Sequence, residues 1–185
     1  RAKARARTAE TFLDTDDHRL RSLACGVMQH HEDDRWFHQT PIFSELSLRF
    51  TVQIRDHLAD DPGMRPSFLG HILVELLLDA ELIEEAPERL DVYYQTVGSL
   101  DLEFLSGAVN QLTTRPVERL AEFVERFSAV RFLYDYLDDG KLLRRLNQIM
   151  NRVGLSPLPE ALRDLLPAAR RDVRTHTRAL LKAPA

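Results

Sequence analysis

Five of the nine prolines stand where a helix would begin, and this placement limits the possible folds more than any other feature of the chain. Proline is well tolerated in a first helical turn, because neither its missing N–H nor its fixed φ disturbs the helix there. No segment alternates Val, Ile or Thr with polar residues as a strand would. The sequence therefore predicts an all-α fold, a bundle of about eight helices. The five prolines are Pro41, Pro66, Pro87, Pro116 and Pro159.

Apolar side chains recur at helical intervals between these prolines. Along residues 120–134, and again along residues 142–153, they fall on one face of a helix and predict a buried side. We expect one domain over residues 1–185, with helices at 16–38, 41–60, 66–85, 87–97, 101–113, 116–138, 141–153 and 159–182.

The composition is that of an ordinary globular protein. Of 185 residues, 44% are hydrophobic and 29% are charged, a balance that supports a buried core in one domain. Residues 1–15 are expected to form a partly ordered tail. Because the chain does not begin with methionine, its native N-terminus is expected to lie upstream. The net charge of −4, with basic residues clustered only at positions 1–7, argues against nucleic-acid binding.

Cysteine content and hydropathy indicate the compartment. The single cysteine, Cys25, excludes an internal disulfide and fits a reducing environment. No apolar run approaches the ~20 residues that span a bilayer. We expect a cytoplasmic protein that does not enter a membrane, and the sequence leaves its oligomeric state open.

A first polar stripe lies in residues 29–38. His30 and Asp34 are four residues apart, so they share a helix face, and His38 continues the row if the helix extends that far towards Pro41. An imidazole and a carboxylate at this spacing can chelate a divalent cation. The alternative is a polar helix end whose side chains are solvated.

A second polar stripe interrupts an apolar helix. His71, Glu75 and Asp79 recur every four residues among Leu, Ile and Val. We expect this helix to be largely buried, and a buried carboxylate is costly unless it is paired or bound to metal. The alternative is that His71 and Glu75 hydrogen-bond each other or an arginine in the core.

Two helices with such pairs are what a metal site in a helix bundle requires. We therefore expect the two stripes to face each other and His71 and Glu75 to be mostly buried. The candidate metal ligands are His30, Asp34, His38, His71, Glu75 and Asp79.

The same residues carry a family resemblance. Gly26, His30, Asp34 and His38 resemble the Gly-x3-His-x3-Asp-x3-Asp pattern of the acyl carrier protein phosphodiesterase family, and residues 68–83 are similar to that family's second acidic helix. Residues 131–152 resemble a later pattern of that family, which consists of a tyrosine, a Leu-rich stretch and Met-x2-Arg. His38 and His71 stand where the family carries carboxylates.

The resemblance implies a fold related to the HD-type metal phosphohydrolases and hydrolysis of a phosphodiester with manganese, zinc or iron. It implies a phosphodiester-containing substrate, with a carrier protein as one candidate partner. Asp34 and Glu75 are the expected metal-holding or proton-accepting carboxylates. Arg35 or Arg131 is expected to neutralise phosphate charge.

Two other functions are compatible with the sequence. The first is a non-catalytic helical scaffold or interaction protein that keeps the fold without the activity. The second is a redox or oxygen-binding di-metal protein, which would want more Glu-x-x-His pairs than this chain contains.

Overall fold

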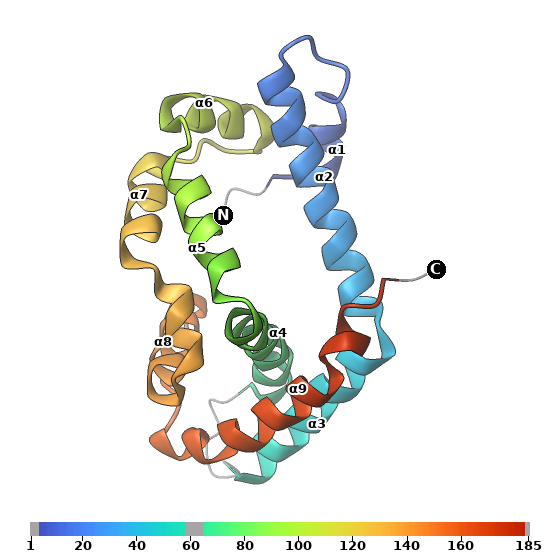
Figure 1. Ribbon diagram of the computed structural model, residues 1–185, viewed down its shortest axis with the longest axis vertical. Coiled ribbons are helices and arrows are strands. Elements are labelled where there is room, and N and C mark those ends of the chain that lie inside the picture. Colours follow the sequence, from blue (N-terminus) through green and yellow to red (C-terminus); the bar gives the residue numbers. More distant parts are fainter. Residues whose placement is uncertain (1–3, 58–64, 184–185) are drawn as a thin grey trace. The chain divides into compact units, whose positions relative to one another are not determined.

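The computed structural model describes residues 4–57 and 65–183. Within these residues the chain is all-α, as predicted, with nine α-helices and two short 3-10 helices (Figure 1). Their one strand-like contact is an isolated bridge between Ala4 and Thr113. The helices are α1 (Ala6–Glu10), α2 (His18–Gln39), α3 (Pro41–His57), α4 (Pro66–Glu85), α5 (Pro87–Gly98), α6 (Leu102–Leu112), α7 (Leu120–Val130), η1 (Phe132–Leu137), α8 (Asp139–Val153), η2 (Glu160–Leu165) and α9 (Leu166–Leu180).

Two of the predicted helices are broken. Segment 116–138 holds α7 and η1, separated at Arg131, whose φ of 49° lies in the left-handed region. Segment 159–182 holds η2 and then α9, because Pro167 in the first turn of α9 lacks the N–H that would bond back into η2. The last three residues of the predicted helix 41–60 lie outside the described residues.

No helix in the described part of the chain combines the length and the apolar character that crossing a bilayer requires. The most apolar of them, α4, carries the His71, Glu75 and Asp79 stripe along its length.

Packing divides the chain into two compact units, and the single domain expected over residues 1–185 stays a prediction. The first unit contains residues 1–36 and 91–131, and the second contains residues 37–90 and 132–185. The boundaries therefore fall inside α2 and α5.

In the first unit α1 packs against α2. Ala9 of α1 is fully buried in a small apolar cluster with Ala24 of α2 and Leu112 of α6, and Phe12 packs against the same cluster. The segment expected to be a partly ordered tail thus contains a packed helix. Burial of its apolar side chains holds that helix in place.

In the second unit α3 and α4 form the centre of the core. Their facing sides contribute Leu46 and Phe50 from α3 and Leu73 and Leu77 from α4, all at most 2% exposed. The two backbones come close together at Gly70, where a Cβ atom would lie 2.5 Å from the carbonyl oxygen of Ser47. Glycine at this position therefore sets the separation of the two helices.

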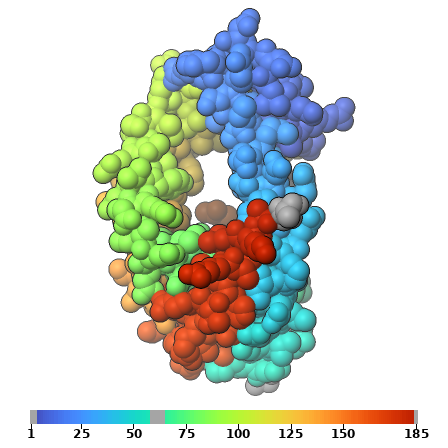
Figure 2. Space-filling model, turned by 45° about the vertical axis from the view of Figure 1, so that its right-hand side comes forward, coloured from blue at the N-terminus to red at the C-terminus, as the bar shows by residue number. Residues whose placement is uncertain are grey.

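The C-terminal helix α9 covers this core. It lies against α3, as the red and cyan segments of Figure 2 show. The Arg170 side chain of α9 holds the start of α8, donating to Asp139 at 2.7 Å and to the carbonyl oxygen of Tyr136 at 2.6 Å. Helices α3, α4, α8 and α9 thus pack together into the core of the second unit, which holds its polar side chains in place.

Candidate metal centre

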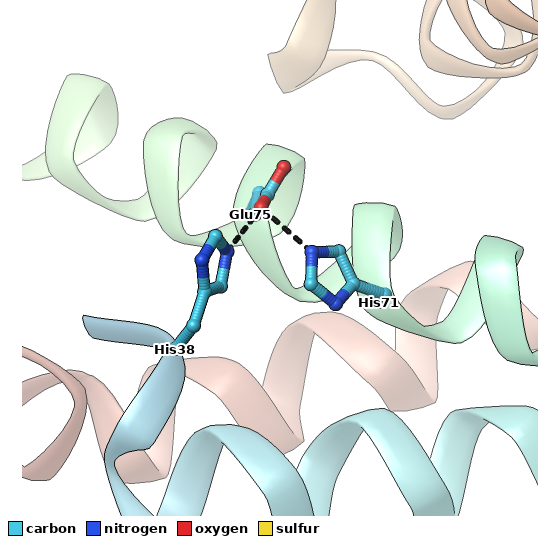
Figure 3. Close-up of side chains that lie close together, drawn as sticks. All are labelled: His38, His71 and Glu75. Atoms are coloured by element: carbon cyan, nitrogen blue, oxygen red, sulfur yellow. Dashed lines mark hydrogen bonds and ion pairs between the residues drawn. The ribbon is translucent and has the colours of Figure 1, made fainter. Parts of the chain in front are cut away.

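Three polar side chains of the second unit converge on one point. His38 comes from the end of α2, and His71 and Glu75 lie one turn apart on α4 (Figure 3). Glu75 Oε1 lies 2.8 Å from His38 Nε2 and 3.2 Å from His71 Nε2. One carboxylate oxygen therefore faces two imidazole nitrogens.

The corner between α2 and α3 places His38. Helix α2 extends to Gln39, so His38 is helical, and Pro41 begins α3. At the corner the buried Thr40 hydroxyl donates to the carbonyl oxygen of Phe37 at 2.9 Å and accepts from the N–H of Phe43 at 3.3 Å. Thr40 thus ties the last turn of α2 to the first turn of α3 and turns His38 towards α4.

The buried ring of Phe43 supports both imidazoles. It makes T-shaped contacts with the His38 ring and the His71 ring, each with 4.8 Å between ring centroids. The centroids of the two imidazole rings are 4.7 Å apart, and the ring planes form an angle of 33°. Phe43 and Thr40 were not among the predicted site residues. Their one sequence signal is that they follow His38 closely at the proline corner.

His71 and Glu75, which were predicted to be mostly buried, are half-buried. Their side chains are 43% and 36% exposed, although the leucines between them are buried. Because most residues of α4 are apolar, the sequence predicted that the whole helix would be buried. The polar stripe instead lies on the face of α4 that is open to solvent. Both side chains nevertheless have a polar partner, as expected.

Asp79 follows Glu75 by one turn of α4 and is not a member of the converging trio. Its side chain retains exposed surface. The surrounding protein nevertheless removes part of the hydration of the carboxylate, and this desolvation, reinforced by repulsion from Glu75, raises the pKa of Asp79 to about 6.

The other predicted ligands lie on α2 in the first unit. His30, Asp34 and the predicted catalytic Arg35 are exposed there. Among the described residues, His38, His71 and Glu75 are the group whose potential metal-ligand atoms lie close together. The convergence of His30 and Asp34 with the α4 stripe stays a prediction.

The donor set of the trio fits a divalent metal ion. Its ligand atoms all lie within 4.8 Å of one another. Ligand atoms about 2.0–2.1 Å from a tetrahedral zinc ion are about 3.3 Å apart, so the distances of 2.8 and 3.2 Å need little expansion. Two histidines and one carboxylate are also the protein ligands of catalytic zinc and non-haem iron sites that keep a position open. The partial exposure of the trio provides such an opening.

No family model, no curated protein and no solved structure matches this chain. The resemblance to the acyl carrier protein phosphodiesterase family, and to HD-type hydrolases generally, therefore stays a prediction.

Proposed function

We propose that this protein is a divalent-metal-dependent phosphohydrolase whose metal centre is formed by His38, His71 and Glu75. The observation that carries the proposal is the convergence of two imidazoles and one carboxylate from two helices at a partly exposed surface. The sequence resemblance points to a phosphodiester as the bond that is hydrolysed. Manganese, zinc and iron are the candidate ions, a carrier protein is a candidate substrate, and the cytoplasm is the proposed location.

Each residue of the trio has a distinct part in this proposal. When bound, a divalent ion polarises a phosphoryl oxygen and makes hydroxide available from water near neutral pH. His38, His71 and Glu75 would hold that ion, and Phe43 keeps both rings oriented. The open side of the trio leaves room for a phosphate group.

Proton transfer has a candidate on the same helix. Asp79 has a pKa of about 6, close to the neutral range in which a general acid or base works best. We assign it the role of exchanging a proton with water or with the leaving group. Asp34 and Arg35, on α2, stay the predicted additional carboxylate and phosphate-neutralising group.

Metal binding is tested first, by equilibrium dialysis of the full chain against zinc and manganese with elemental analysis. We expect one ion per chain, lost in Glu75→Gln and in His71→Ala. Glu85→Gln, at the exposed end of the same helix, and His176→Ala, whose ring bonds its own helix backbone, are matched controls that should keep the ion. Equal metal content in all five proteins would refute the centre.

Activity is tested next on the metal-loaded protein with bis-(p-nitrophenyl) phosphate, a general phosphodiester. Hydrolysis that requires the metal and disappears in Glu75→Gln supports the proposal. A protein that binds the ion at the trio but hydrolyses neither this diester nor a phosphomonoester contradicts the phosphohydrolase assignment. Absence of metal binding favours the scaffold function.

A further inference from the structure

A cavity of the first unit shares no lining residue with the proposed metal centre. It lies between α2 and α6, is open to solvent and has a volume of about 860 Å³, within the range of about 300–1,000 Å³ that small-molecule sites occupy. Leu23 and Val27 of α2 and Phe104 and Leu105 of α6 give it an apolar lining. This combination of size and lining is what an apolar ligand requires.

Gly26 opens the middle of this cavity. It lies inside α2 and lines the cavity, and a Cβ atom built on it would meet no atom within 4 Å. Glycine inside a helix costs about 0.5–1 kcal/mol relative to alanine. Packing within the protein does not require glycine here, so its effect is to leave space in the cavity.

A row of α2 side chains runs along the cavity. His18, Ser22, Gly26 and His30 recur every four residues and all line it. Twelve residues of helix span about 18 Å, so the row has small residues in its middle and a histidine at each end. The space is therefore elongated.

The lining contains no free carboxylate that would repel an anion. Its single carboxylate, Asp101, is already engaged by Arg19 at 2.9 Å and by the N–H of Phe104 at 3.0 Å. His31 bonds the carbonyl oxygen of Ala4 at 3.1 Å. His18 and His30 remain as hydrogen-bond donors at the two ends, with no unpaired carboxylate opposite them in the lining.

We propose that this cavity binds a small elongated amphipathic anion, with an apolar body over Gly26 and a carboxylate at one of the terminal histidines. The apolar side chains of the lining cover one side of the ligand body, and the histidines select the charged end. The inference is independent of the metal centre, because it uses no residue of the His38, His71 and Glu75 trio.

Calorimetric titration of the full chain with dodecanoate, below the concentration at which it forms micelles, tests the site. We expect saturable binding of one molecule per chain. Dodecanol, which has the same length without the charge, and dodecyltrimethylammonium, which reverses the charge, should bind at least about tenfold more weakly. Absence of saturable binding, or equal affinity for all three compounds, would overturn the proposal.

Matched leucine variants locate the site. Gly26→Leu fills the cavity and should weaken dodecanoate binding at least about tenfold. Gly107→Leu is the control: Gly107 lies inside α6, is also free of atoms within 4 Å of its Cβ position, and does not line the cavity. It should leave binding unchanged. Circular dichroism checks that both helices form, and Gly26→Ala gives a second, milder reduction with no risk to folding.

The histidine ends are tested by the double variant His18→Ala/His30→Ala. It should weaken dodecanoate about fivefold or more and leave dodecanol unchanged. Unchanged dodecanoate binding in this variant, or in both Gly26 variants, would place the ligand elsewhere and refute the assignment.

Discussion

Among the candidate site residues, Asp79 is the one whose pKa is raised, and this shift makes the stability of the protein depend on pH. An aspartate in the unfolded chain titrates near 3.8, whereas Asp79 in the folded protein titrates at about 6. The folded protein therefore binds this proton more tightly. The contribution to stability is complete below about pH 4 and is lost as the pH rises through 6.

Asp79→Asn, which is neutral throughout, should gain stability relative to the wild type between pH 4 and pH 8. We expect a gain of about 1 kcal/mol, because the exposure of the side chain reduces the larger value that the shift alone would give. Urea unfolding at both pH values measures it, with Glu85→Gln on the same helix as a control. A difference between variant and wild type that is equal at both pH values would contradict the assigned shift.

At the scale of helices, the approach of α3 to α4 depends on one missing side chain. The Cβ of an alanine at Gly70 would lie 2.5 Å from a backbone oxygen of α3 and 2.6 Å from the Thr51 hydroxyl. Because the backbone atom cannot move aside, the two helices would have to separate. The same separation would displace His71, the next residue on α4.

Gly70→Ala should therefore lower the free energy of unfolding by about 2 kcal/mol or more. Gly107→Ala, in open space on α6, should raise it by about 0.5–1 kcal/mol. Chemical denaturation of both variants measures the contrast. Two alanine variants that change stability in the same direction would show that Gly70 does not set the helix separation.

The α2–α3 corner makes a second prediction for helices. Thr40→Ala removes both corner hydrogen bonds and should cost about 1–2 kcal/mol. Thr40→Ser keeps the hydroxyl and should restore most of that loss. Because the corner orients His38, Thr40→Ala should also weaken zinc binding, as measured by equilibrium dialysis. An unchanged zinc affinity would show that the corner does not position the site.

Helix boundaries show what local sequence decides. Prolines at positions 41, 66 and 87 begin helices as predicted, because the first turn imposes its own steric rule. The break at Arg131 was missed, since an arginine in the left-handed region has no sequence signature. His38, His71 and Glu75 were predicted as ligands, but their exposure was not, because it depends on which side of α4 its neighbours leave uncovered.

At the scale of the whole molecule, the two units differ in their cores. The buried cluster of the second unit draws on α3, α4, α8 and α9, whereas the first unit's cluster centres on Ala9, Ala24 and Leu112. Helix α7 has no buried residue although its apolar face is pronounced. Resistance to local opening follows buried apolar contact.

Amide hydrogen exchange should therefore be slower in α3 and α4 than in α6 and α7. Zinc at one hundred times its dissociation constant should add about 2.7 kcal/mol to the free energy of exchange of those amides whose exchange requires the metal site to unfold. Mass spectrometry of exchanged peptides measures both effects. Uniform protection of the two units, or a zinc effect confined to α6 and α7, would contradict this account.

The sharing of Glu75 Oε1 has a consequence for imidazole tautomers. A carboxylate has no proton to give, so the bond at 2.8 Å requires His38 to carry its hydrogen on Nε2. The contact of His71 at 3.2 Å favours the same form. An ion that takes the Nε2 positions must send these hydrogens to Nδ1 or to solvent. Loading of the centre would then appear as a change of tautomer in the ¹⁵N spectrum of the two rings.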